Sequence, residues 1–235
     1  MQETNIITKA YKCRIYPNKK QCTQLAKTFG CVRFVYNYYL GKRIEFYENE
    51  HKTLTYNACA KDLTELKNTL NWLKEVDSTS LQSSLKNLDI AYKNFFKGDA
   101  GFPKFKRKRD NHKSYTTKFT NNNIEFLGNY IKIPKLGTVK TKTTLKPEGK
   151  ILSVTISKEP SGKYYASIAC EDVVVDKFTK TGNLIGIDLG IKSFCILSDS
   201  TIFENPKYLK KSLDNIKKAQ KELSRKQKGS SIYKK

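Results

Sequence analysis

The sequence predicts an α+β protein, in which a small antiparallel β-barrel carries an inserted helical bundle and is followed by a strand hairpin and a basic helix. Three observations predict this fold class. Apolar residues recur at helical spacing across residues 18–97, and the period changes to two between Tyr115 and Cys170. A lone strand pattern at residues 9–16 precedes the helices. Because an isolated strand needs a partner, we expect it to complete the barrel.

The inserted bundle is predicted to contain four helices. The first covers residues 18–30, and Gly30 separates it from a second helix that runs to about Glu48. Residues 55–70 form the third helix, with Tyr56 and Leu63 facing inward. Ser78 is expected to cap the fourth helix, whose buried stripe comprises Leu81, Leu85, Leu88, Tyr92 and Phe95.

Short alternating segments predict the strands. Six of them lie between Tyr115 and Cys170, separated by turn residues such as Gly128 and Gly137. Residues 172–183 are interpreted as a linker. Residues 184–198 then predict a strand hairpin, which a third short strand and a helix at 207–228 follow.

Charge is the strongest compositional signal. The 235 residues include 45 Lys+Arg against 22 Asp+Glu, a formal net charge of +23. Because the basic residues alternate with Tyr, Phe, Asn and Thr, nucleic acid is the favoured partner, although a membrane surface or an acidic protein remains open. No apolar run approaches the ~20 residues that span a bilayer, and no signal-peptide pattern is evident. We therefore expect a cytoplasmic protein with no membrane partner.

The six cysteines predict no zinc site. They lie at positions 13, 22, 31, 59, 170 and 195, and none forms the Cys-x-x-Cys pair that zinc modules use. Reduced structural thiols fit a cytosolic compartment better than disulfides do.

Two segments concentrate positive charge. Residues 103–113 contain a single acid, Asp110, against six basic residues, namely Lys104, Lys106, Arg107, Lys108, Arg109 and Lys113. A loop of this charge density repels itself unless an anion is near, so phosphate contact is favoured over a merely solvated loop. The predicted C-terminal helix is basic as well, with Lys210, Lys211, Lys217, Lys218, Arg225 and Lys226 as candidate phosphate ligands.

Nine motifs in fixed order resemble one known family, the TnpB/OrfB proteins of insertion sequences. The motifs are RIYPNKKQ, FGCVRFVYNYYL, WLKEVDSTSLQSSLKNLDIAYKNFF, GFPKFKRK, TNNNI, IKIPKLGTVKTK, GKILSVTISKEPSGKYY, GIDLGIKSF and LSRKQKGS. They extend over nearly the whole chain. The family comprises transposon-encoded, RNA-guided DNA endonucleases related to type V CRISPR effectors.

The resemblance implies a domain organisation and a set of partners. Residues 1–17 would supply the first strand of a wedge-like barrel, 18–113 a helical recognition domain (the transposase helix-turn-helix region), and 114–175 the rest of the barrel. Residues 176–235 would begin a nuclease domain of the ribonuclease H (RuvC) type. The implied partners are a guide RNA from the element's end and a double-stranded target DNA, with one chain on each RNA.

Asp188 matches the family's first metal-binding aspartate. Such a site holds two divalent ions, here Mg²⁺, which activate water and stabilise the leaving oxygen. The family's later carboxylates and its four-cysteine zinc module would lie beyond the basic helix, so we expect a C-terminally truncated member that binds nucleic acid without cutting it. With one ligand, Mg²⁺ would bind weakly, and Asp188 would lie near solvent at an unfinished sheet edge. Family positions that face the duplex motif flanking the target correspond to Tyr56, Gln82, Thr120 and Asn121.

Two other functions remain open. The chain could be a binding-only, RNA-guided repressor or a decayed transposase fragment. A strand followed by Asp-x-Gly is also the first phosphate motif of actin-like and sugar-kinase ATPases. The residues after Gly190 lack the small hydroxyl and glycine pattern that holds ATP phosphates in that class, which makes it the weaker alternative.

Overall fold

The computed structural model describes residues 4–110, 113–142, 147–176 and 181–233. The chain forms two compact units, Met1–Lys177 and Phe178–Lys235. In the described part of the chain, none of the helices is both long and apolar enough to cross a membrane.

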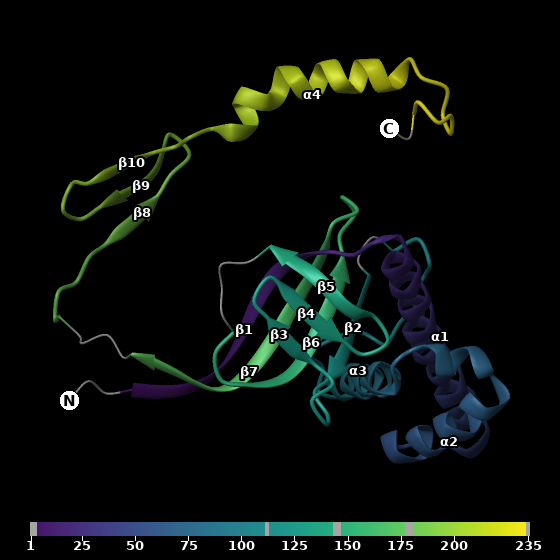
Figure 1. The fold of residues 1–235 in the computed structure, drawn as a ribbon. Helices are drawn as coiled ribbons and strands as arrows, with labels where there is room; N and C mark the ends of the chain where they lie inside the picture. The colour runs from purple at the N-terminus through teal and green to yellow at the C-terminus, as the bar shows by residue number, and fades with distance from the viewer. Residues whose placement is uncertain (1–3, 111–112, 143–146, 177–180, 234–235) are drawn as a thin grey trace. The chain divides into compact units, whose positions relative to one another are not determined.

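The first unit contains a seven-stranded antiparallel sheet. Its strands are β1 (Thr4–Tyr16), β2 (Lys113–Lys118), β3 (Glu125–Leu127), β4 (Tyr130–Ile133), β5 (Gly137–Lys142), β6 (Lys150–Lys158) and β7 (Tyr164–Asp176). They lie in the order β2-β6-β7-β1-β5-β4-β3, and Figure 1 shows the sheet strongly curled. Among the described residues no pairing joins the edge strands β2 and β3, so the barrel expected from the sequence is an open half-barrel.

The first strand lies in the middle of this sheet. β1 pairs with β7 on one side and with β5 on the other, and Ile15 lies opposite both Tyr164 and Thr141. Tyr11, Cys13 and Ile15 are buried while the residues between them are not, as expected for a strand with one covered face. The prediction that the isolated strand joins the later sheet is confirmed.

The predicted linker at residues 172–183 is partly wrong. β7 continues to Asp176 because β1 extends back to Thr4, and the two strands pair along their whole length. Residues 177–180 of that linker lie outside the described part of the chain.

The helical bundle has three α-helices and one short 3₁₀ helix. These are α1 (Lys19–Glu50), α2 (Tyr56–Thr69), η1 (Asn71–Glu75) and α3 (Ser78–Phe96). The predicted break at Gly30 is wrong, since α1 passes through it without interruption. A glycine inside a helix costs about 1 kcal/mol relative to alanine, and the burial of Leu25, Phe29 and Val32 around it outweighs that cost.

Asp77, rather than the predicted Ser78, caps α3. Its carboxylate accepts from the backbone N–H of Ser80 at 3.2 Å and from the Thr117 hydroxyl of β2 at 2.5 Å. The hydroxyl of Thr79 also accepts from the backbone N–H of Lys118 at 3.0 Å. The first turn of α3 is therefore fastened to β2.

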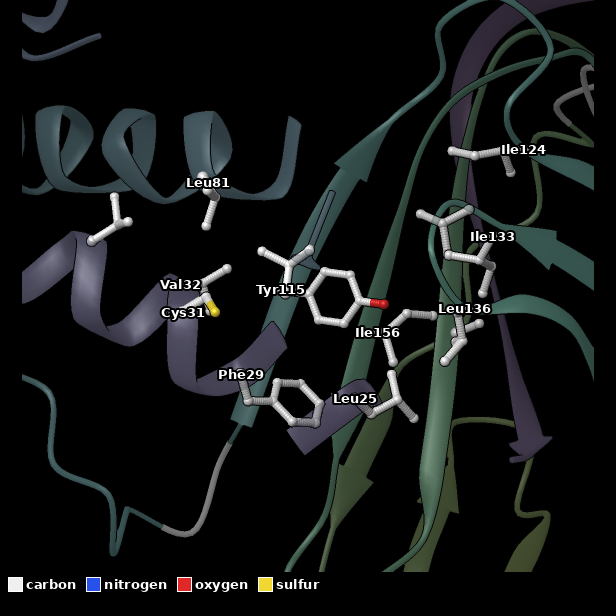
Figure 2. Close-up of a cluster of buried hydrophobic side chains, with 14 of the residues drawn as sticks. Leu25, Phe29, Cys31, Val32, Leu81, Tyr115, Ile124, Ile133, Leu136 and Ile156 are labelled. Carbon is white, nitrogen blue, oxygen red and sulfur yellow. The ribbon is translucent and has the colours of Figure 1, made fainter. Parts of the chain in front are cut away.

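A shared core joins the helices to the sheet. Figure 2 shows Phe29 and Val32 of α1 and Leu81 of α3 beside Tyr115 of β2. The rings of Phe29 and Tyr115 meet edge to face, with centroids 5.6 Å apart. Because this core covers the inner part of α1, it fixes the direction in which the outer residues of that helix point.

The second unit is a small sheet followed by a helix. Strands β8 (Ile187–Leu189), β9 (Ser193–Leu197) and β10 (Ile202–Glu204) lie in the order β10-β9-β8, and α4 covers Tyr208–Ser224. The hairpin, third strand and basic helix expected from the sequence are present. That they begin a ribonuclease H-type domain stays a prediction.

Candidate nucleic-acid interface

The basic loop that follows α3 is attached to the side of α1. The Asn37 side chain makes two hydrogen bonds with the backbone of Lys106, accepting from its N–H at 2.8 Å and donating to its carbonyl at 2.9 Å. The ammonium of Lys106 lies 4.1 Å from the ring centroid of Tyr36. Inside the loop, Asp110 accepts from the backbone N–H of Arg107 at 2.7 Å. These contacts give the loop a defined position on the helix.

A cavity of about 240 Å³ lies between the loop and α1, and we call it the cationic cavity. Its lining residues come from the helix, the loop and the start of β2, and they are Phe29, Val32, Arg33, Lys106, Arg107, Asp110, Lys113 and Ser114. Four of them carry positive charge and one carries negative charge. Two arginines and two lysines line this one cavity, and both residue types commonly bind phosphate, which arginine holds with paired donors.

The Lys106 ammonium is partly desolvated, although the residue as a whole is exposed. Desolvation of its ammonium lowers the pKa of Lys106 from its ordinary value. A phosphate placed in the cavity would favour the charged form of this lysine, because a nearby opposite charge stabilises it. The cavity therefore holds positive charge that no carboxylate other than Asp110 offsets among its described lining residues.

The structure divides the predicted loop residues into two groups. Lys106, Arg107 and Lys113 line the cationic cavity, whereas Lys104, Lys108 and Arg109 lie outside it. Apart from the half-buried Lys113, all of these basic residues are exposed. Sequence reasoning missed Arg33. Its spacing from Phe29 and Asn37 places all three on one side of α1, which is a signal that helical periodicity carries.

The four residues assigned to duplex contact do not form one cluster. Gln82 is exposed on α3, one turn beyond Thr79. The hydrogen bond from the Lys118 N–H to the Thr79 hydroxyl holds that turn of α3 next to the segment that contains Thr120 and Asn121. Tyr56 instead shares a cavity with Asp89 and Tyr92, two turns further along α3. Asn121 has a positive φ of 48°, which its turn requires.

The basic residues of α4 are exposed along a helix with no buried side chain among its described residues. Lys210, Lys211, Lys217 and Lys218 lie within the helix, while Arg225 and Lys226 follow its last residue. The leucines and isoleucine of its apolar face, Leu209, Leu213, Ile216 and Leu223, remain 39–69% exposed. The helix presents both a charged and an apolar side.

Asp188 lies on the edge strand β8. Its backbone pairs with Ile196 of β9, and all three residues of β8 are exposed, so its carboxylate has no desolvation penalty to offset. The next glycine, Gly190, has a local role, since a Cβ there would lie 3.0 Å from the Ser193 carbonyl. In the described residues, no three His, Cys, Asp or Glu side chains gather as a metal site would require. The residues present around Asp188 do not fit a two-metal centre.

Comparison with known proteins places both ends of this chain in the same family. Residues 1–52 match the family model "Helix-turn-helix domain" of insertion-sequence OrfB proteins, and residues 165–235 match the "Probable transposase" model of the same proteins. The protein named "Putative RNA-guided DNA endonuclease" from Streptomyces pristinaespiralis is 32% identical over 234 residues, which is 97% of this chain. "Putative RNA-guided DNA endonuclease InsQ" from Escherichia coli (strain K12) is 33% identical over 228 residues, or 96% of this chain.

The chain belongs to the TnpB/OrfB family. It spans 58% and 56% of the lengths of these two relatives. One solved structure, a Cas12f1–sgRNA–target DNA complex, aligns with 93% of this chain and 62% of its own, at 13% identity and a TM-score of 0.38. The two matched ranges of the OrfB chain contain β1 and α1 at one end and β8–β10 and α4 at the other. The basic loop and Arg107 fall between them.

Proposed function

We propose that this OrfB-family chain binds a guide RNA from its element's end and a double-stranded DNA target, one chain on each RNA, in the cytoplasm. The cationic cavity is the observation that carries the proposal, because four cations from three segments converge on a space that suits a phosphate. The printed names of the two relatives, which describe RNA-guided DNA endonucleases, support the choice of partners.

Within this proposal, residues 1–235 bind their nucleic acids without cutting them, as a binding-only protein would. Support comes from Asp188, a solvent-exposed carboxylate on an edge strand with no cluster of metal-ligating residues around it in the described part of the chain. Purified chain, cognate RNA, target DNA and millimolar Mg²⁺ should give no more cleavage than an Asp188→Ala control. Mg²⁺-dependent cutting that the control lacks would overturn this part of the proposal.

The binding part is tested by the salt dependence of affinity. With about 6–10 phosphate contacts, affinity should fall about 10³–10⁵-fold between 50 and 200 mM salt. The variant with Arg33→Gln, Lys106→Gln and Arg107→Gln together should bind more weakly. Because each lost phosphate contact removes about 0.9 from the slope of log affinity against log salt, this slope should flatten by about two to three.

A matched control separates local contact from overall charge. Lys132→Gln, Lys140→Gln and Lys163→Gln remove the same net charge from exposed positions on the sheet side of the first unit. This control should retain the wild-type slope to within about one phosphate contact. Equal losses in both triple variants would show that general charge, rather than the cationic cavity, carries the binding. An affinity indifferent to salt would remove nucleic acid as the partner.

A further inference from the structure

A second cavity opens on the opposite half of the helical bundle, and we call it the aromatic pocket. It encloses about 510 Å³ between the C-terminal half of α1 and the end of α3, within the range typical of small-molecule sites. Three of its aromatic side chains are unusually open to solvent, since Phe96 is 70%, Tyr47 57% and Phe102 46% exposed. None of these residues belongs to the cationic cavity.

Four rings of the pocket form one connected group, namely those of Tyr92, Phe95, Phe96 and Phe102. Tyr92 and Phe96 are stacked with centroids 6.3 Å apart, and Phe102 meets Tyr92 edge to face at 5.7 Å. Leaving a phenylalanine exposed forgoes about 1.5–3 kcal/mol of burial free energy. Exposed apolar side chains gathered around one cavity mark a binding site more often than chance exposure does.

A buried arginine lines the same pocket. The Arg43 side chain is only 4% exposed, and its Nη2 donates to an Asp89 carboxylate oxygen at 3.3 Å. Its Nε is buried with no hydrogen-bond partner among the described residues. Leaving such a donor unpaired costs about 1–3 kcal/mol, so a ligand that brings an acceptor and lets the guanidinium adjust would recover part of that energy.

The charged groups in and beside the pocket favour one class of ligand over others. Glu48 lines the pocket and Asp89 already pairs with Arg43, so a bare phosphate would meet a carboxylate and a guanidinium whose charge is already offset. A purely apolar side chain would leave the buried Nε of Arg43 without a hydrogen-bond acceptor. A nucleobase combines flat faces for the aromatic rings with ring donors and acceptors that arginine and glutamate recognise.

We propose that the aromatic pocket receives one unpaired nucleobase from a nucleic acid held on the basic surface of the molecule. This inference rests on the proposed function, because the net charge of +23 is what attracts the polyanion. Phe96 and Tyr47 stack on the base, and Arg43 and Glu48 contact its edge. An unpaired base of RNA and one of single-stranded DNA share this chemistry.

Three ligands of equal phosphate number test the proposal with the full chain: a single-stranded RNA, a single-stranded DNA and a blunt duplex. Phe96→Ala should weaken binding of one or both single strands about 5- to 150-fold, the effect of losing one stacked base, and should leave the duplex unchanged. The strand that loses more affinity identifies the source of the base. Phe96→Tyr keeps a ring and should bind as the wild type does.

Tyr130→Ala is the control, because Tyr130 is 46% exposed on β4 outside the pocket and should not discriminate between ligands. Since Phe96 is so exposed, its replacement should leave the urea unfolding midpoint near that of the wild type. Equal effects of Phe96→Ala on all three ligands, or none on any, would overturn the pocket while leaving nucleic-acid binding intact. A wild-type chain that binds none of the three ligands would overturn both proposals.

Discussion

The two compact units use similar strands but differ in what covers them. In the first unit, β1 is paired on both sides and α1 and α3 share a core with the sheet, so Ile15, Val35 and Leu85 are at most 2% exposed. In the second, Cys195 is the one buried hydrophobic residue in the described range, whereas Leu189 and Ile191 are 72% and 91% exposed.

This difference shows that an apolar strand pattern predicts a strand but does not predict whether other elements bury it. The run IGIDLGIKSFCILS is rich in apolar residues, yet it contributes to a sheet of three strands in which Cys195 is the one buried residue of the run. The stabilising core therefore belongs to the first unit, and the second unit's apolar residues contribute little burial energy.

The largest difference should appear in a pair of truncations. Leu85→Ala removes a side chain that is 1% exposed in the first unit and should lower the free energy of unfolding by about 2–5 kcal/mol. Ile187→Ala, at 62% exposed in the second unit, should change it by less than about 0.5 kcal/mol. Urea unfolding measures both: the fluorescence of Trp72, the single tryptophan, follows the first unit, and far-ultraviolet circular dichroism follows the whole chain. Similar losses for the two variants would mean that the hairpin is covered in solution.

The helix caps should show a smaller difference. Asp77→Ala removes the bonds from Ser80 and Thr117 and should cost about 1–3 kcal/mol, whereas Asp77→Asn keeps a good cap and should cost less. The corresponding N-cap of α4, Lys207, makes no side-chain cap bond. Lys207→Ala should therefore leave helix content by circular dichroism unchanged. A loss for Lys207→Ala equal to that of Asp77→Ala would contradict the contrast.

The smallest difference should appear as a dependence on pH. Burial raises the pKa of Asp62, but hydrogen bonds from Lys42 at 2.6 Å and from Tyr39 at 2.8 Å outweigh it, and the net pKa is lowered. A lowered folded-state pKa stabilises the protein above the unfolded value of about 3.9 and loses that contribution as the pH falls. Because this carboxylate is partly exposed, the effect should stay below about 1 kcal/mol.

The measurement compares wild type with Asp62→Asn by urea unfolding at several pH values. The wild type should be the more stable near neutrality, and the gap should close between about pH 5 and pH 3. In the second unit, the backbone N–H of Thr201 donates to Asp199 and lowers its pKa, but this residue is fully exposed. Asp199→Asn should leave the Trp72 transition unchanged at every pH. A gap for Asp62→Asn that is independent of pH would argue against the ion pair.

Local sequence patterns predicted most helices and strands. They failed where contacts between residues far apart in the sequence determine the structure. The period of two identified all the strands of the half-barrel, and helical spacing identified Leu63, Leu81 and Leu85 as core residues. Gly30 misled because glycine is only a weak local breaker, and the packing of α1 on both sides of it was invisible. Closure of a barrel depends on pairing between β2 and β3, which no local pattern reports.

The candidate site was predictable to the same extent. Charge density located Lys106, Arg107 and Lys113, because clustering of one sign is visible in the sequence. Arg33 and Asn37 could not be assigned to that loop, since the bonds to Lys106 join residues far apart in the chain. Arg43 was missed for a similar reason, because its partner Asp89 lies on another helix.

The central position of β1 in the sheet has a consequence for folding during synthesis on the ribosome. β1 is synthesised before its longest partner, β7, which follows about 150 residues later in the chain. At ~5–20 residues per second, β1 therefore waits on the order of 10–30 s before its edge can pair. Folding of the half-barrel cannot start from β1 alone, and the delay leaves the unpaired backbone of this strand open to chaperones or to neighbouring chains.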